Sequence, residues 1–210
     1  MTQAPLMDRI HITEDYDVPR VINGGWQLSA GHALERPLDL ADASRAFNRL
    51  IDMGFDTFDC ADIYTGVEDF FGGIIRERRK AGLRLPQIHT KFVPDLNDLA
   101  NVTPAYIENI ITRSLRRLGV ERLDAVQFHW WDYSVPGMVD VAGELVRLQE
   151  KGLIRLISTT NFNAVELRKL IDAGIPVATN QCQYSVLDRR PAMRLERLCR
   201  ETGVKLLCYP

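Results

Sequence analysis

Apolar residues recur along this chain with two alternating periods. Short runs rich in β-branched and aromatic residues, typical of buried strands, alternate with longer stretches in which apolar residues repeat every three or four positions, as on one face of a helix. The predicted strands cover residues 21–28, 55–61, 87–92, 124–130, 153–162, 177–185 and 204–210. The predicted helices cover residues 39–54, 67–81, 103–119, 138–151, 163–173 and 190–202. The polar residues 1–20 predict an extension or a short hairpin.

The helix predicted over 103–119 has the clearest boundaries. Thr103 can serve as the N-cap, Pro104 suits the first helical position, and Gly119 ends the apolar stripe. Three arginines of this segment are expected on its solvated outer face: Arg113, Arg116 and Arg117.

Strands that alternate with helices of this length imply a parallel sheet, either doubly wound and open or closed into an eight-stranded barrel. An open sheet concentrates its chemistry at one switch point, whereas a barrel draws its site from the ends of many strands. No GxGxxG motif follows the first predicted strand. Polar residues stand at the C-terminal ends of successive predicted strands: Asp59, Lys91, His129, Thr160, Asn161, Gln181 and Tyr209. The pattern therefore favours an α/β fold of the (β/α)8 barrel type.

Composition narrows the class of protein further. Apolar residues make up 46% of the 210 residues, charged residues 26%, and the formal net charge is −2, which is typical of a globular protein and argues against a nucleic-acid binder. No apolar run approaches the ~20 residues that span a bilayer, and the N-terminus shows no secretory signal, so a cytoplasmic location is expected. The histidines form no ligand cluster, and no metal is predicted. Four widely spaced cysteines are expected to be reduced core thiols: Cys60, Cys182, Cys199 and Cys208.

Three of the strand-end residues, together with Tyr64, offer the parts that carbonyl reduction needs. After hydride reaches the carbonyl carbon, the oxygen needs a proton from a positioned donor. Tyrosine, with an ordinary pKa of ~10, becomes a usable acid when a neighbouring ammonium favours tyrosinate and a carboxylate keeps that ammonium charged. Tyr64 follows Asp59 by five residues, and Lys91 and His129 end the next two predicted strands.

Each of these residues also has an ordinary structural interpretation. Asp59 could cap a loop, Lys91 could be a solvated rim residue, His129 could be a core histidine, and Tyr64 could simply pack in a turn. A plain core gives no reason for acid, phenol, ammonium and imidazole to fall in this order, so the joint pattern favours catalysis.

Five segments resemble the aldo-keto reductase family. They are GFDTFDCADIYTGVEDFFG, HTKF, QFHWW, TTNF and NQCQYS. The resemblance runs from about residue 20 to the end of the chain. The resemblance implies a nicotinamide-dependent reductase of aldehydes or ketones.

Carried over residue by residue, the resemblance implies the following roles. Tyr64 would be the general acid, Lys91 would lower its pKa, Asp59 would pair with Lys91, and His129 would orient the carbonyl and share in proton donation. Thr160, where the family usually has serine, would bind the nicotinamide carboxamide together with Asn161 and Gln181. Tyr209 would stack on the nicotinamide ring, and Trp26 and Trp130 would line an apolar substrate pocket.

The predicted pattern stops at its seventh strand, whereas an (β/α)8 barrel needs eight strands and ~250 residues. We therefore expect an extension over residues 1–20 and an incomplete barrel over 21–210 that lacks strand eight and has open edges suited to self-association. The resemblance implies NADP as cofactor, with its phosphate-binding segment beyond the seventh strand. Two functions stay open: an NAD(P)H-dependent oxidoreductase, and a catalytically inactive regulatory or binding protein of the same fold.

Overall fold

The computed structural model describes residues 8–29 and 39–210. Residues 1–7 of the predicted extension lie outside the described residues. The chain divides into two compact units, the first made of Met1–Thr90 with Arg113–Glu121 and the second of Lys91–Thr112 with Arg122–Pro210.

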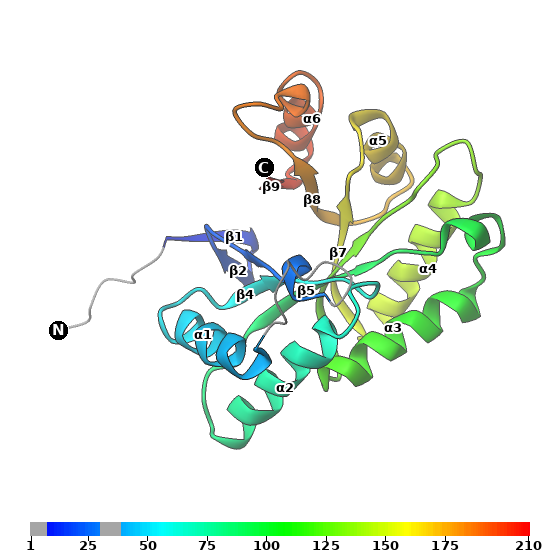
Figure 1. The fold of residues 1–210 in the computed structure, drawn as a ribbon. Coiled ribbons are helices and arrows are strands. Elements are labelled where there is room, and N and C mark those ends of the chain that lie inside the picture. Colours follow the sequence, from blue (N-terminus) through cyan, green and yellow to red (C-terminus); the bar gives the residue numbers. More distant parts are fainter. Residues whose placement is uncertain (1–7, 30–38) are drawn as a thin grey trace. The chain divides into compact units, whose positions relative to one another are not determined.

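The first unit opens with a hairpin, one of the two alternatives expected for residues 1–20, in which β1 (Arg9–Thr13) pairs antiparallel with β2 (Tyr16–Pro19). Its parallel strands pair in the order β3–β4–β5, and helices α1 and α2 lie between them in the chain (Figure 1). The elements are β3 (Asn23–Gly24), the 3-10 helix η1 (Trp26–Leu28), α1 (Leu40–Asp52), β4 (Thr57–Asp59), α2 (Val67–Lys80) and β5 (Gln87–Phe92), whose last two residues belong to the second unit. The unit also holds the C-terminal part of α3 (Pro104–Leu118).

The second unit continues the alternation. Strands β6 to β9 pair in parallel in chain order. The elements are η2 (Leu96–Asn101), the start of α3, β6 (Leu123–Phe128), α4 (Met138–Glu150), β7 (Ile154–Thr160), α5 (Ala164–Asp172), β8 (Val177–Gln183), η3 (Arg190–Ala192), α6 (Leu195–Thr202) and β9 (Lys205–Tyr209). Because the parallel strands β3 to β9 keep their sequence order, the topology is that of an incomplete (β/α)8 barrel, and the doubly wound alternative, whose strand order reverses, is excluded.

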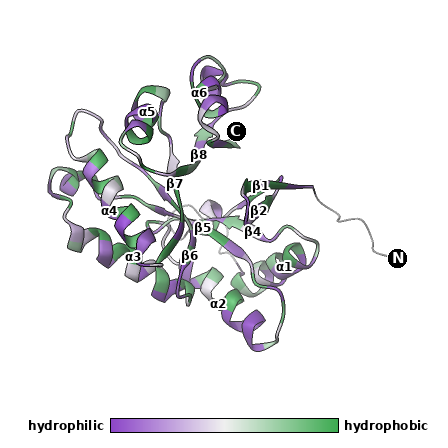
Figure 2. Cartoon of the chain, turned by 180° about the vertical axis from the view of Figure 1, so that it is seen from behind, coloured by the Kyte–Doolittle hydropathy of each residue, from purple (hydrophilic) through white to green (hydrophobic). Residues whose placement is uncertain are grey.

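The helices form where the apolar stripe predicted them. In α4 the buried residues recur at helical spacing, and Figure 2 shows hydrophobic and hydrophilic residues interleaved along this helix. The N-cap of α3 is confirmed, because the Tyr106 backbone N–H donates to Thr103 Oγ1 at 3.2 Å. Gly119, at φ 68°, ends α3 in the left-handed region that glycine enters without steric cost.

Two predicted elements differ from the structure. The strand predicted over 21–28 is limited to β3, because the backbone turns into η1 through hydrogen bonds such as that from the Leu28 N–H to the Gly25 carbonyl. The helix predicted over 190–202 is divided into η3 and α6. Met193 and Arg194 separate the two helices, and the backbone of Arg194, at φ −121° and ψ −43°, leaves the helical region.

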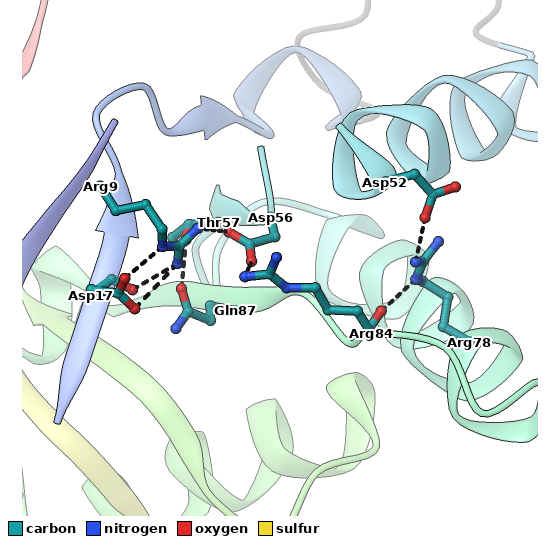
Figure 3. Close-up of polar contacts among 8 residues, drawn as sticks. All are labelled: Arg9, Asp17, Asp52, Asp56, Thr57, Arg78, Arg84 and Gln87. Carbon is teal, nitrogen blue, oxygen red and sulfur yellow. Dashed lines mark hydrogen bonds and ion pairs between the residues drawn. The ribbon is translucent and has the colours of Figure 1, made fainter. Parts of the chain in front are cut away.

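Ion pairs attach the hairpin to the first parallel strands (Figure 3). Asp56, 1% exposed, accepts a hydrogen bond from Arg9 Nη1 at 2.9 Å and also pairs with Arg84. Arg9 Nε donates in turn to Asp17 Oδ2 at 2.6 Å, and this guanidinium lowers the pKa of Asp17. The buried carboxylate of Asp56, the residue before β4, thus joins β1 to the segment that leads to β5.

Candidate active site

Asp59 and Tyr64 lie in the first unit, at the end of β4 and in the loop that follows it. The Asp59 carbonyl accepts a hydrogen bond from the Gly25 N–H at 2.8 Å. A Cβ on Gly25 would lie 2.9 Å from Val67 Cγ1 and 3.0 Å from that carbonyl oxygen, so this close approach requires glycine. Tyr64 is half-buried, and its turn is closed by hydrogen bonds from its N–H to the Ala61 carbonyl and from the Val67 N–H to its own carbonyl, both 3.1 Å.

A buried polar cluster holds the loop that carries Tyr64. Glu68, 1% exposed, accepts from Thr90 Oγ1 at 2.7 Å and from Arg117 Nη1 at 3.2 Å. Arg117 Nη1 also donates to the Asp62 carbonyl at 3.1 Å, and Arg113 pairs with the Asp62 carboxylate at 3.3 Å. The cluster therefore fixes the loop against β5 at the residue that precedes Lys91 in the chain.

This cluster corrects the expectation that Arg113 and Arg117 lie on a solvated helix face. Each is only about one third exposed, and each reaches an acidic residue about 50 positions earlier in the chain. Their spacing of four residues places them on one face of α3, but a buried acidic partner is visible only in the folded structure.

Lys91 and His129 lie in the second unit. Lys91 is 6% exposed on β5, so it is not a rim lysine. His129 directly follows β6, and its N–H donates to the Phe92 carbonyl at 3.0 Å. Its Nδ1 lies 3.2 Å from the Thr160 carbonyl oxygen. Since a carbonyl only accepts, Nδ1 carries the proton of this hydrogen bond, and in the neutral ring Nε2 is an acceptor.

His129 should be neutral at pH 7. Burial lowers the pKa of His129 and the charge of Lys91 lowers it further, against the raising effect of the hydrogen bond to Thr160. Because the unfolded chain takes up this proton near pH ~6.5, the stability contribution of the neutral ring is fully present above that pH and is lost as the pH falls through the lower folded pKa. An NMR titration should place the midpoint of His129 below that of the same chain in urea. A folded midpoint at or above the urea value would contradict this prediction.

Thr160, Asn161, Gln181 and Tyr209 are brought together at the ends of β7, β8 and β9. Thr160 is the register partner of Gln181, and Thr160 Oγ1 donates to Gln181 Oε1 at 3.4 Å. The Asn161 N–H donates to the Gln181 carbonyl at 2.7 Å, and the Tyr209 hydroxyl donates to Asn161 Oδ1 at 2.7 Å. One hydroxyl and two amides match the donors and acceptors of a carboxamide, and the 37% exposed ring of Tyr209 adds an aromatic surface beside them.

The predicted pocket residues differ in exposure. Trp26, on η1 of the first unit, is 45% exposed. Trp130 is 1% exposed, because its indole N–H donates to the Val135 carbonyl at 3.2 Å and its ring packs beside Phe128. Trp130 therefore belongs to the core of the second unit and not to an open pocket wall.

Trp131, which is not among the predicted pocket residues, is exposed next to His129. Its ring is 47% exposed and stands edge-on to the imidazole, with ring centroids 4.5 Å apart. The indole N–H donates to the Pro94 carbonyl at 2.8 Å, which fixes the ring in this position. The segment QFHWW contains two adjacent tryptophans, but only the tertiary packing decides which of them is buried.

Other candidate groups take no part in this arrangement. Within residues 8–29 and 39–210, no group of three or more His, Cys, Asp or Glu side chains could hold a metal ion. None of the four cysteines forms a disulfide. Three are buried as expected, whereas Cys208, on β9, is exposed and is not a core thiol. No helix in the described part of the chain has the length and apolar character needed to cross a bilayer.

Comparison with known proteins identifies relatives along nearly the whole chain. The model of the aldo/keto reductase family matches residues 20–210. Chloroplastic pyridoxal reductase of Arabidopsis thaliana is 29% identical over 202 residues, which cover 88% of this chain and 52% of that protein. NADH-specific methylglyoxal reductase of Escherichia coli is 28% identical, over 94% of this chain and 64% of its own length. Aldo-keto reductase yakc [NADP(+)] of Schizosaccharomyces pombe is 27% identical, over 85% of this chain and 54% of its own length.

Solved structures agree in fold. A thermostable aldo-keto reductase in complex with the inhibitor epalrestat superposes with a TM-score of 0.80 at 23% identity, covering 97% of this chain and 72% of its own. An aldo-keto reductase from Bacillus halodurans in its holo form superposes with a TM-score of 0.78 at 23% identity, covering 96% of this chain and 65% of its own. This chain spans about half to two thirds of the length of the curated relatives above. Because the family model matches all but the first residues, the chain belongs to the aldo/keto reductase family.

Proposed function

We propose that the protein reduces an aldehyde or ketone to an alcohol with a nicotinamide cofactor. The observation that carries this proposal is the group of Thr160, Asn161, Gln181 and Tyr209 at the ends of three neighbouring strands. It combines carboxamide-compatible hydrogen-bonding groups with an exposed aromatic ring. Family membership and the names of two relatives, a pyridoxal reductase and a methylglyoxal reductase, support the same reaction class.

In this proposal the bound cofactor supplies the hydride, and residues of the chain supply the proton. Tyr64 is the general acid that protonates the carbonyl oxygen as the hydride arrives. Lys91 favours the tyrosinate that remains, and Asp59 keeps Lys91 charged. The burial of Lys91 supports this role, because an ammonium that is 6% exposed needs anionic or polar partners to stay protonated.

We propose that at neutral pH His129 positions the substrate by contact with its ring, and that it donates neither a hydrogen bond nor a proton to the carbonyl oxygen. Its Nδ1–H is directed to the Thr160 carbonyl, so the neutral ring has only an acceptor at Nε2. This narrows the expectation that His129 shares in proton donation, since donation from Nε2 would require the imidazolium that burial disfavours. Trp131, edge-on to this ring, presents an apolar surface to the substrate.

NADP is the cofactor we propose. The choice between NADP and NAD is not made by the carboxamide-binding residues, because the two dinucleotides share the nicotinamide. One relative is named for NADP(+) and another is named as NADH-specific. The function therefore has to be tested with both cofactors.

Titration of the 210-residue chain with NADPH and with NADH, followed by protein fluorescence, tests the proposal. We expect saturable binding that is tighter for NADPH, and oxidation of the bound dinucleotide on addition of methylglyoxal or pyridoxal. Binding without oxidation of either dinucleotide, across a panel of aldehydes and ketones, would instead support the inactive binding protein. Absence of binding in a chain that melts cooperatively would refute the nicotinamide site.

A further inference from the structure

Asn161 has an unusual backbone conformation at the centre of the proposed carboxamide site. Its φ is 63°, and it is the one non-glycine residue with positive φ in the part of the chain that the structure describes. Residues other than glycine enter this region at a cost in free energy, although asparagine does so more readily than most. Such a conformation persists only where neighbouring groups hold it.

Three hydrogen bonds, each with a different residue, hold Asn161. Its N–H donates to the Gln181 carbonyl at 2.7 Å, its Oδ1 accepts from the Tyr209 hydroxyl at 2.7 Å, and its carbonyl accepts from the Tyr133 hydroxyl at 3.2 Å. The first two partners belong to the cofactor residues already proposed. Tyr133 comes from a different part of the unit, the loop between β6 and α4.

Tyr133 is built to remain a donor. Its ring packs edge-on against Phe162, with centroids 5.6 Å apart, and this packing fixes the position of the hydroxyl. Burial raises the pKa of Tyr133 to about 12, and the charge of Glu166 adds to the effect. The hydroxyl therefore keeps its proton throughout the physiological range. The same loop carries His129 and Trp131, the residues proposed to contact the substrate.

We propose that Tyr133 is a positioning residue that holds Asn161 in its left-handed conformation, so that the Asn161 amide is directed to the cofactor carboxamide. This inference rests on the proposed function. With Oδ1 bound to the Tyr209 hydroxyl, the Asn161 amide presents its N–H donors to the carboxamide oxygen. Loss of the Tyr133 hydroxyl lets the peptide after Asn161 rotate, which withdraws the side chain from that position. Tyr133 thereby links the loop that carries His129 to the cofactor site.

The substitution Tyr133→Phe removes the hydroxyl and keeps the ring packed on Phe162. We expect the Kd for NADPH to rise about three- to tenfold, the range set by the loss of one hydrogen bond. The kcat at saturating cofactor should stay within about twofold, because the proton donor and the reacting atoms are untouched. Tyr106→Phe is the matched control. Its hydroxyl also bonds a backbone group, the Asp95 N–H at 3.0 Å, but lies outside the cofactor residues, and the Kd should not change.

The variant Asn161→Gly separates positioning from general stability. Glycine adopts positive φ without strain, so in that background the backbone no longer needs the Tyr133 hydrogen bond to keep its conformation. Tyr133→Phe should then have no further effect on the Kd. An equal loss of affinity in both backgrounds, or no loss in either, would overturn the proposal.

Hydrogen exchange makes this test independent of the cofactor. In the cofactor-free protein, Tyr133→Phe should accelerate exchange of the Asn161 amide, which donates to the Gln181 carbonyl, about three- to tenfold. Failure of the unmodified chain to bind either dinucleotide would refute the proposed function. Unchanged exchange at Asn161 would refute the role of Tyr133, whatever the cofactor result.

Discussion

Replacing Tyr64 by phenylalanine should lower kcat/KM for aldehyde reduction by about 10²- to 10⁴-fold, the range of general acid catalysis. The proton that completes the alcohol would then have to come from water or from a poorer donor. Tyr64 lies in a loop closed by two backbone hydrogen bonds and held by the Glu68 cluster, so removal of one oxygen should leave the loop in place. Stopped-flow measurement of NADPH oxidation at saturating cofactor gives the rate directly.

The specificity of this effect is tested by the nucleotide affinity and by a control tyrosine. The Kd for NADPH should be unchanged in Tyr64→Phe, because the proposed carboxamide-binding residues lie on β7, β8 and β9. Tyr106→Phe should keep full activity. A Tyr64→Phe variant with undiminished kcat/KM would show that another group protonates the carbonyl oxygen.

The substitution Gly72→Ala should destabilise the first unit by about 3 kcal/mol or more, at the upper end of the cost of overpacking. Gly72 is buried on α2, and a Cβ there would lie 2.0 Å from the carbonyl oxygen of Arg117 on α3. The obstacle is backbone, so no side-chain rotation can relieve it, and α2 would have to move away from this end of α3. That movement would also stretch the hydrogen bonds from Arg117 to Glu68 and to the Asp62 carbonyl.

Urea unfolding of this variant should show a lower midpoint than the unmodified chain. The neighbouring glycine offers a matched control, since a Cβ on Gly73 would meet nothing within 4 Å. Gly73→Ala should be neutral or stabilise α2 by up to about 1 kcal/mol, because alanine has the higher helix propensity. Equal unfolding midpoints for the two variants would show that the contact between α2 and α3 is looser than the structure indicates.

The helices and strands were predictable because their signals are local. The apolar period of α3, its cap at Thr103 and its stop at Gly119 all lie within one segment of the chain. The alternation of strands and helices then left two architectures, and polar strand ends favoured the barrel that the strand order confirmed. The deviations fall where the local signal was weak, as at η1 and at the start of the helix predicted over 190–202.

The candidate site was predictable only in part, because some of its contacts join residues that lie far apart in the chain. Their places at predicted strand ends and the resemblance to the family selected Thr160, Asn161, Gln181 and Tyr209, and the structure brings these residues together on adjacent strands. Neither the strand ends nor the resemblance indicated that Tyr133 bonds the Asn161 carbonyl from 28 residues away. The positive φ of Asn161 was equally hidden, because asparagine is also common in ordinary turns and caps.

The sequence by itself determined the class of this protein: its alternating periods encode the strands and helices, and its motifs, in their order, encode the family. The tertiary structure alone decided which of two adjacent tryptophans is buried, and which helix arginines face buried carboxylates. The physical reason is distance along the chain. Periodicity and capping act within a few residues, whereas burial and ion pairing depend on partners such as Glu68 and Arg117, which lie 49 positions apart and meet only when the chain has folded.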